Sequence, residues 1–387
     1  MNFVFLSPHF PPNWFRFCVA LRAAGARVFG IADAAYDALR PELRGALGEY
    51  YRVRDMNDYD QLVRAMGHLT HRHGKLDRID SLNEYWLETE ARLRTDFNLD
   101  GIKSDRILDI KRKSRMKEIY RAAGIPVAQG RVARTFSEAR ALLEEVGYPV
   151  VAKPDVGVGA MATWKIDEER ALERFFERKP PGDFILEEFV RGRIVTFDGL
   201  VDQEGRVVFF SSLAYGRGIM ETVNEDDHVF YYTTREIPPD LEEVGRRTLS
   251  AFDVRGRFFH LEFFRRDPDG TLVALEVNMR PPGGLTTDMW NYANDFDIYR
   301  EWANVVVHDR FEAIWSRPYF CGYAGRKHSK RYAHGHEEVL AKLDGLIVQH
   351  EPMDSIFRQA IGDYGYLVRS PSEEDILEAV RFIHELA

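Results

Sequence analysis

The stretch from Phe258 to Gly284 constrains the fold more than any other part of the chain, because it predicts a β-hairpin. Two apolar runs, Phe258–Phe264 and Thr271–Val277, flank the sequence Asp267-Pro268-Asp269-Gly270, which is a strong turn signal. Side chains alternate between the two faces of a strand. One face of the hairpin is therefore expected to be apolar and to hold Phe259, Leu261, Phe263, Leu275 and Val277.

The opposite face of the hairpin gathers polar side chains. His260 and Glu262 lie on it in the first strand, and Glu276, Asn278 and Arg280 follow in the second. We expect a register that sets Glu262 roughly opposite Glu276. Two carboxylates, an amide and a guanidinium group would then share one patch of the sheet.

Facing carboxylates destabilise a sheet unless a positive charge lies between them. A hard divalent cation held by carboxylate and amide oxygens is one solution, and Mg²⁺ leaves coordination positions open for substrate phosphates. The alternative is a solvated hairpin face that happens to be acidic, although ordinary exposed strands rarely place Glu-x-Asn-x-Arg in so apolar a setting. The Pro281-Pro282-Gly283-Gly284 segment then ends the strand and brings backbone close to the site.

The composition of the chain is that of an ordinary soluble protein. Its 387 residues suffice for two or three domains, and 45% are hydrophobic and 30% charged. The net charge of −9 argues against an obligate nucleic-acid-binding protein. The N-terminus does not resemble a signal peptide, and no apolar run approaches the ~20 residues that span a bilayer, so no membrane partner is expected. Only two cysteines occur, Cys18 and Cys321, which fits a cytoplasmic location and excludes a disulfide framework.

Residues 1–100 alternate between strand and helix patterns, which predicts a parallel sheet covered on both faces. Ligands of such sheets bind beyond the carboxyl ends of the strands, here Ser7–Asn13 and Asn83–Glu84. The first of these loops lacks the glycine fingerprint of a dinucleotide site. Glu84 either contacts a polar substrate or caps the following helix. The expected strands are Asn2–Ser7, Arg27–Ala32, Tyr50–Val53 and Ile79–Leu82, and the expected helices are Trp14–Ala24, Tyr59–Leu69 and Leu87–Phe97.

A basic amphipathic helix is predicted for residues 107–123. It carries Lys111, Lys113 and Lys117 on one positive face. A solvated helix surface is the ordinary explanation of such a run.

A further lysine, Lys153, lies inside the β-branched strand Tyr148–Pro154. An ammonium group is costly in a buried strand unless it meets an anion. The loop after this strand contains Gly157 and Gly159, and its small residues allow backbone N–H groups to close over phosphate. The glycine loop alone would be weak support for a phosphate site.

Together these segments resemble the ATP-grasp superfamily. The matching sequences are HLEFF, LEVNMRPPGG, RKSRMKEIYRAAGIPV and YPVVAKP, and no GxxxxGK[ST] motif occurs anywhere in the chain. Lys111 stays an alternative to Lys113, because family members usually have Asp-Lys where this chain has Arg112-Lys113. The resemblance implies ATP-phosphate binding by Lys113 and Lys153, a flexible lid with Gly157 and Gly159, metal binding by Glu262, Glu276 and Asn278, and contact of Arg280 with an acyl phosphate.

The segment Phe184–Gly192 resembles the hinge strand that lies beneath the adenine in this family. The resemblance implies that the chain near Glu187, Glu188, Phe189 and Val190 offers backbone groups to the base. Family members generally carry an acid for the ribose two residues after the hinge glycine, where this chain has Ile194. Asp198 lies on the same face of the following strand and is either its substitute or a plain sheet residue.

The resemblance implies an α/β protein, α+β in the ATP-binding part, with an ATP-grasp fold after an N-terminal parallel-sheet pre-ATP-grasp domain. We expect three domains at residues 1–106, 107–192 and 193–387. Ala214–His228 is expected to be a substrate loop, with Arg217 as an anion contact. The remaining expected elements are one helix over Thr286–Val307, strands near Phe320–Gly325, Leu346–Glu351 and Tyr366–Arg369, and a closing helix at Ser372–Leu386.

The activity implied by the resemblance is that of an ATP-dependent ligase. A small carboxylate would be activated as an acyl phosphate and joined to an amine (or a thiol), with release of ADP and phosphate. The implied cofactors are ATP and Mg²⁺, with two ions expected and Mn²⁺ as an alternative metal. The implied partners are a small-molecule carboxylate and amine, and a homodimer is compatible with the sequence. Two alternatives are a non-catalytic ATP-binding regulator and a biotin-type carboxylase, although we recognise no bicarbonate-site pattern.

Overall fold

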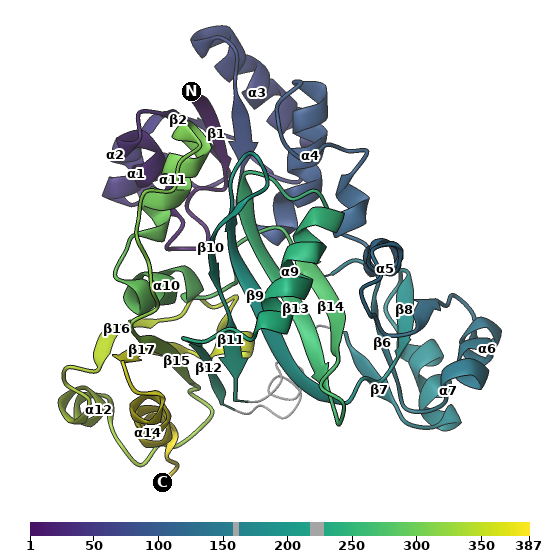
Figure 1. The fold of residues 1–387 in the computed structure, drawn as a ribbon. Helices are drawn as coiled ribbons and strands as arrows, with labels where there is room; N and C mark the ends of the chain where they lie inside the picture. Colours follow the sequence, from purple (N-terminus) through teal and green to yellow (C-terminus); the bar gives the residue numbers. More distant parts are fainter. Residues whose placement is uncertain (158–161, 217–227) are drawn as a thin grey trace.

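A computed structural model describes residues 1–157, 162–216 and 228–387 of the protein. Its strands form three sheets with helices around them (Figure 1). The first sheet uses strands from residues 2–80, the second from residues 130–188, and the third from residues 192–370. Each of the three expected domains therefore contains one sheet, and the domain boundaries stay a prediction.

The first sheet is parallel, as the alternating strand and helix patterns predicted. Its strand order is β3-β2-β1-β4, and β1 pairs in parallel with both β2 and β4. Helices cover both faces of this sheet in Figure 1, so that every residue of β1 is buried. The strands are β1 (Asn2–Leu6), β2 (Arg27–Ala32), β3 (Leu47–Arg52) and β4 (Arg78–Asp80), and the helices are α1 (Phe15–Ala23), η1 (Tyr36–Ala38), α2 (Pro41–Ala46), α3 (Tyr59–His73), η2 (Glu84–Trp86) and α4 (Leu87–Asp96).

The basic helix expected over residues 107–123 is interrupted. A short helix η3 (Ile107–Ile110) ends before Arg112, which is extended, and α5 (Lys113–Ala122) begins after it. The side chain of a distant residue, Asp155, caps the new helix by accepting hydrogen bonds from the Ser114 backbone N–H at 2.8 Å and the Ser114 hydroxyl at 2.9 Å. Because this cap comes from another part of the chain, no local pattern marks it.

The second sheet is antiparallel and has the order β5-β8-β6-β7. Helix α6 packs on it and begins with a capping box, in which the Thr135 side chain accepts from the Glu138 N–H and the Glu138 side chain accepts from the Thr135 N–H. The elements are β5 (Gly130–Val132), α6 (Phe136–Val146), β6 (Val150–Pro154), β7 (Trp164–Ile166), α7 (Glu169–Arg178) and β8 (Phe184–Glu188).

The third sheet is the largest and has the order β14-β13-β9-β11-β12-β15-β17-β16, with β10 paired to β9. It contains the predicted hairpin, formed by β13 and β14. The strands are β9 (Gly192–Val201), β10 (Val207–Ser211), β11 (Leu213–Tyr215), β12 (Val229–Thr233), β13 (Arg257–Arg266), β14 (Leu272–Asn278), β15 (Phe320–Arg326), β16 (Ile347–Pro352) and β17 (Tyr364–Ser370).

The single helix expected over Thr286–Val307 is two helices, α10 and α11. Asp295 between them adopts a left-handed conformation with φ of 55°, which ends α10. The Asp297 side chain then caps α11 by accepting from the backbone N–H groups of Tyr299 and Arg300. The helices of this part are α9 (Pro239–Ala251), α10 (Thr286–Asn294), α11 (Ile298–His308), α12 (His336–Lys342), α13 (Arg358–Ile361) and α14 (Glu373–His384).

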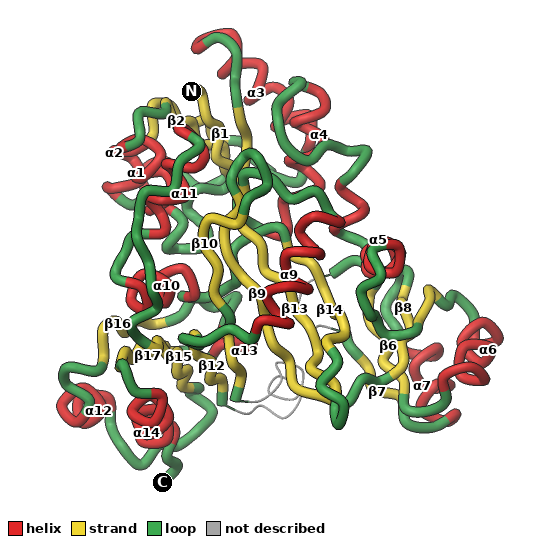
Figure 2. The backbone as a smooth tube through the Cα atoms, viewed as in Figure 1, coloured by secondary structure: helices red, strands yellow, loops and turns green. Residues whose placement is uncertain are grey.

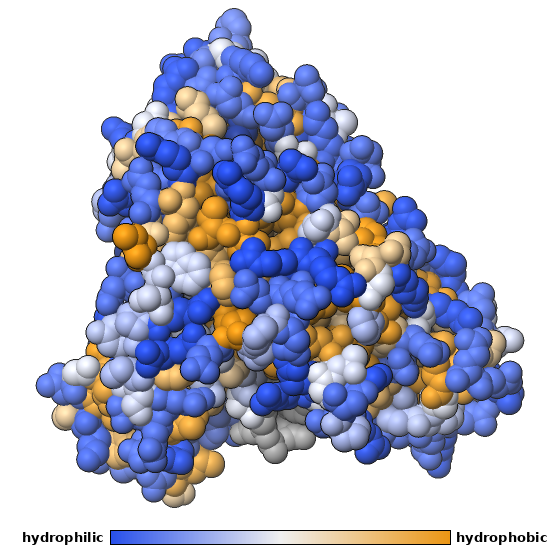
Figure 3. Space-filling model, in the orientation of Figure 1, coloured by the Kyte–Doolittle hydropathy of each residue, from blue (hydrophilic) through white to orange (hydrophobic). Residues whose placement is uncertain are grey.

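The strands lie inside and the helices outside (Figure 2), and the surface seen in Figure 3 is mostly hydrophilic. In the described part of the chain, no helix is both long enough and apolar enough to cross a membrane. One aromatic cluster joins the first sheet to the third. The ring of Trp302, which is fully buried, lies 5.9 Å from that of Phe3, 5.0 Å from that of Phe17 and 6.3 Å from that of Phe258.

Replacing the central ring of this cluster should weaken the whole fold. We expect Trp302→Ala to lower the free energy of unfolding by about 3–5 kcal/mol, because it leaves a cavity where two sheets meet. Ile314→Ala is the control, since its side chain is 97% exposed and its loss should change stability by at most about 0.5 kcal/mol. Equal denaturant midpoints for the two variants would contradict this account of the core.

Candidate active site

A pocket of about 330 Å³ lies between the second sheet and the hairpin of the third. Charged side chains enter it from three directions: Lys113 from α5, Lys153 and Glu187 from the second sheet, and Glu262 and Glu276 from the hairpin. The remaining lining is largely apolar and includes Ala128, Val151, Phe189, Val190, Ile194, Phe264, Ala274 and Leu275. A pocket that combines apolar walls with several charged groups suits a ligand with a flat ring and an anionic tail.

The hairpin has the predicted register. Glu262 pairs directly with Glu276, and His260 pairs with Asn278. The register shifts between Glu262 and Phe263, so that Leu275 has no partner across the strand pair. This bulge corrects the expectation for Leu275, which lines the pocket instead of the apolar face.

The paired carboxylates lie close to cations, and Glu276 is buried while the Glu262 side chain is 13% exposed. Burial raises the pKa of Glu262, an effect that His260 opposes and the carboxylate of Glu276 reinforces. The Lys113 Nζ lies 3.2 Å from a carboxylate oxygen of Glu276. Glu262 and Glu276 are therefore a pair of anions that needs positive charge beside it.

The oxygen atoms on this face fit a hard cation such as Mg²⁺. Glu262, Glu276 and Asn278 supply two carboxylates and an amide oxygen on neighbouring strands. Among residues 1–157, 162–216 and 228–387, no group of three or more His, Cys, Asp or Glu side chains is arranged as a metal site. A cation here would rest on these two carboxylates and the amide, with its other positions open to phosphate oxygens.

Two lysines share one buried acid at the other wall of the pocket. The Glu187 carboxylate lies 3.0 Å from the Lys153 Nζ and 3.2 Å from the Lys117 Nζ. Burial opposes ionisation of Glu187, but the two ammonium groups hold its pKa below the usual value. The sequence pointed to the backbone of Glu187, whereas the structure brings its side chain into the site. Lys117 was not predicted as a site residue, although it is four residues after Lys113 on the same helix face.

The two rival lysines occupy different places. Lys113 lines the pocket, and its Nζ also donates to the Gly157 carbonyl at 3.1 Å. The Lys111 Nζ instead lies 2.8 Å from the Glu84 carboxylate. The geometry therefore favours Lys113 as the lysine next to a ligand of the pocket.

Glu84 does not cap the helix that follows it. The cap is Asn83, whose side chain accepts from the Tyr85 N–H. The Glu84 carboxylate, nearly buried, lies between Lys111 and Arg280, with the Arg280 Nε at 3.5 Å. Arg280 also donates to the Pro281 carbonyl at 2.9 Å. These three charged side chains adjoin the proposed metal-binding face, which consists of Glu262, Glu276 and Asn278. They lie near the carboxyl end of β4, where a ligand was expected.

Two backbone N–H groups of the hinge segment already donate hydrogen bonds to other parts of the protein. The Glu188 N–H donates to the Gln129 carbonyl at 2.8 Å, and the Phe189 N–H donates to the Pro149 carbonyl at 3.2 Å. No hydrogen bond within the described ranges uses the Val190 N–H. The base edge would therefore find a free donor at Val190, and the N–H groups of Glu188 and Phe189 are occupied.

Asp198 does not reach the pocket. Its carboxylate is fully buried and accepts from the Thr196 hydroxyl at 2.6 Å, and it pairs with the His260 ring at 2.6 Å. Burial lowers the pKa of His260, but the Asp198 carboxylate outweighs this effect and raises it. Asp198 is thus a structural partner of His260 beside the metal-binding face and is a poor candidate for the ribose. Gly159 and Arg217 lie outside the described residues.

Known proteins resemble this chain in sequence and in fold. The ATP-grasp domain family matches residues 146–288. An L-arginine-specific L-amino acid ligase of Bacillus subtilis is 24% identical over 276 residues, which cover 67% of this chain and 66% of that protein. The chain thus spans less than two thirds of the length of the curated relatives that it matches.

Solved structures share the fold over nearly the whole chain. The L-amino acid ligase of Bacillus licheniformis has a TM-score of 0.74 at 17% identity and covers 98% of this chain and 96% of its own. The biotin carboxylase domain of the Hydrogenobacter thermophilus 2-oxoglutarate carboxylase, solved with MgADP and bicarbonate, has a TM-score of 0.68 at 17% identity and covers 98% of this chain and 88% of its own. Residues 146–288 thus match the ATP-grasp domain family, and the chain as a whole shares its fold with these solved structures.

Proposed function

We propose that the protein is an ATP-dependent ligase that activates a small carboxylate as an acyl phosphate, joins it to an amine, and releases ADP and phosphate. The observation that carries the proposal is the pairing of Glu262 with Glu276, with Asn278 and Arg280 next to them on the edge of a lysine-lined pocket. This arrangement offers cation ligands, phosphate contacts and an anion-binding guanidinium group in one place.

The pocket suits ATP along its whole length. The adenine would lie between the apolar walls near Phe189 and Leu275, with the Val190 N–H toward the base. Lys113 and Lys153 would hold phosphates, and Lys117 would keep Glu187 neutralised. Glu262, Glu276 and Asn278 would hold Mg²⁺, with two ions proposed and Mn²⁺ as an alternative; the metal would neutralise phosphate charge.

The residues next to the metal-binding face would hold the other substrate. Its carboxylate attacks the γ-phosphorus of ATP, ADP leaves, and the amine then displaces phosphate from the acyl phosphate. The Arg280 guanidinium would bind oxygens of the transferred group and of its tetrahedral successor. Positioning by these side chains and compensation of negative charge would supply most of the rate.

Amino acids are the proposed source of both the carboxylate and the amine. The support is the likeness to an L-arginine-specific L-amino acid ligase, which is 24% identical. Glu84 and Lys111, which offer an anion and a cation near Arg280, suit a ligand with both charges. A homodimer is also proposed, by analogy with the dimeric biotin carboxylase domain. ADP release that requires an amino-acid carboxylate and an amine together tests the activity and separates it from an idle ATP-binding regulator.

Removing one of the paired charges should abolish turnover and leave the fold intact. We expect Glu276→Gln to lower Mg²⁺-dependent ADP release by roughly two orders of magnitude, because an amide does not replace the anion that the cations need. Glu144→Gln, on the exposed surface of α6, is the matched control. A coupled assay of ADP release measures both variants, and turnover of Glu276→Gln at the control's level would refute the metal-binding face.

Replacing Lys113 and replacing Lys111 should weaken the binding of two different substrates. Lys113→Ala should weaken ATP affinity by roughly 10- to 100-fold, since it removes a charge-assisted contact to phosphate. Lys111→Ala should leave ATP affinity within about threefold and raise the KM of the carboxylate substrate, because Lys111 faces Glu84. Titration calorimetry with a non-hydrolysable ATP analogue and steady-state kinetics give both quantities. The reverse pattern would assign the phosphate contact to Lys111.

Arg280 should act on the chemical step more than on nucleotide binding. Arg280→Lys keeps the charge but loses the planar fork, so kcat is expected to fall by roughly tenfold or more while ATP affinity stays within about threefold. Arg266→Lys, in the hairpin turn, is the control. If Arg280 merely holds Glu84 in place, thermal stability and ATP affinity would fall together with kcat, and its catalytic role would be wrong.

A further inference from the structure

A second cavity, of about 450 Å³, lies at the beginning of β13, a strand that also lines the ATP pocket farther along. Its wall includes Arg78, the first residue of β4, and Arg257, the first residue of β13. Glu262 is five residues along β13 from Arg257, a separation of roughly 17 Å on an extended strand. The cavity and the ATP pocket have no lining residue in common. It is therefore a separate feature of the fold, at the junction of the first and third sheets.

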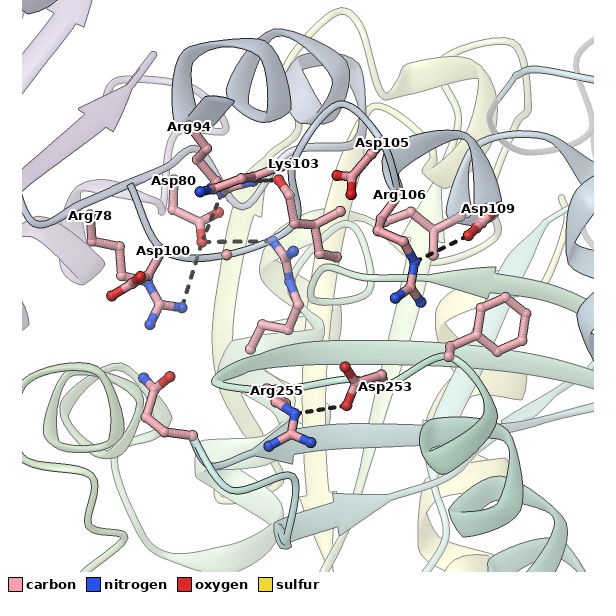
Figure 4. A pocket seen from close by; sticks show the side chains of 16 residues that line it. Arg78, Asp80, Arg94, Asp100, Lys103, Asp105, Arg106, Asp109, Asp253 and Arg255 are labelled. Atoms are coloured by element: carbon pink, nitrogen blue, oxygen red, sulfur yellow. Dashed lines mark hydrogen bonds and ion pairs between the residues drawn. The ribbon is translucent and has the colours of Figure 1, made fainter. Parts of the chain in front are cut away.

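Three arginines share one carboxylate at the base of this cavity. Arg78 and Arg94 converge on Asp80 in Figure 4, and their guanidinium nitrogens lie 3.9 Å and 3.7 Å from its oxygen. Arg257 approaches the same oxygen at 3.7 Å. Glu90 also belongs to this buried group and pairs with Arg94 at 2.7 Å, whereas the carboxylates of Asp100, Asp105, Asp109 and Asp253 lie elsewhere in the cavity wall.

The positive charge of this cluster exceeds the negative charge. Three guanidinium groups face two carboxylates, and burial together with the Asp80 carboxylate raises the pKa of Glu90 to about 7. Burial, with a smaller contribution from the neighbouring arginines, likewise lowers the pKa of Arg78 to about 10 and that of Arg257 below its usual value. A purely structural ion cluster would be expected to balance its charges.

Two of the buried arginines also have N–H donors that form no hydrogen bond among the described residues. Within the part of the chain that the structure describes, the buried Nε atoms of Arg94 and Arg257 have no hydrogen-bond partner. Both side chains are at least 95% buried and line the cavity. An unpaired buried donor is costly. Two other arginines of the cavity wall each have an acid partner of their own: Arg106 pairs with Asp109 at 3.3 Å, and Arg255 pairs with Asp253 at 2.7 Å (Figure 4). The unsatisfied charge therefore lies at the base.

We propose that this cavity binds a small dianionic phosphate group through Arg78, Arg94 and Arg257. A dianion would offset the excess charge, and its oxygens would accept from planar guanidinium forks. The group could belong to free phosphate or to a phosphate monoester, whose organic part would meet Ile102, Ile110 and Phe252 in the wall. Because the site spans β4 and β13, its ligand would tie the first sheet to the third.

Hydrogen-exchange mass spectrometry on the full chain tests the proposal. Without Mg²⁺, inorganic phosphate should slow exchange in residues 99–110 and 252–257, relative to chloride at the same ionic strength. Phenyl phosphate is the second probe: stronger protection than by inorganic phosphate identifies a monoester site, and equal protection identifies a site for the free ion. No protection by either probe beyond that of chloride would overturn the proposal.

Variants locate the bound phosphate. Arg257→Gln should raise the phosphate concentration that gives half-maximal protection by roughly tenfold. Arg246→Gln removes the same charge from the surface of α9 and should change this concentration by less than about twofold. Arg257→Lys retains the charge and serves if the glutamine variant does not fold; a severalfold loss is expected from the missing fork. Lys153→Ala should keep the protection. Protection that is lost in Lys153→Ala but retained in the Arg257 variant would place phosphate in the ATP pocket and refute the second site.

Discussion

Two buried carboxylates that face each other across a strand pair, Glu262 and Glu276, are the constraint on which the rest of the active site depends. A sheet tolerates such a pair only with positive charge beside it. In the described structure Lys113 supplies part of that charge at 3.2 Å, and the oxygen donors leave room for metal and phosphate. The repulsion that would weaken an ordinary hairpin makes this face a candidate site for a cation and the phosphate that it binds.

The position of Lys113 depends on a contact far from the hairpin. Asp155, which follows β6, caps α5 and fixes the first turn of the helix that begins with Lys113. The same strand carries Lys153, so one short segment positions two of the pocket's cations. Charged side chains of the second sheet, α5 and the hairpin therefore meet at the pocket. A nucleotide bound there would contact both the second sheet and the hairpin.

Much of this arrangement follows from local sequence rules. Strand alternation and a clear turn signal determine the hairpin, so its register could be predicted, and the alternating patterns of the first 100 residues correctly predict a parallel sheet. The bulge at Leu275 could not be predicted, because nothing in its neighbours marks the extra residue. The break between η3 and α5 was missed for a different reason, since Asp155 is 41 residues away in sequence from Ser114, whose N–H donates to its carboxylate. The partners of Glu84 are distant in sequence and come together with it only through tertiary packing. Asp198 lies on the predicted face of its strand, but its carboxylate is hydrogen-bonded to Thr196 and His260.

In the proposed reaction, the charged face of the hairpin directs transfer of phosphate from ATP to a carboxylate. The most direct measurement uses an amino acid whose carboxylate carries a heavy oxygen isotope, together with an amine that supports ADP release. An acyl phosphate intermediate transfers one carboxylate oxygen to the released phosphate, so the account predicts that phosphorus NMR will detect one heavy oxygen per phosphate formed. Unlabelled phosphate in the presence of steady ADP release would show that water, and not the carboxylate, attacks ATP, and would contradict the account.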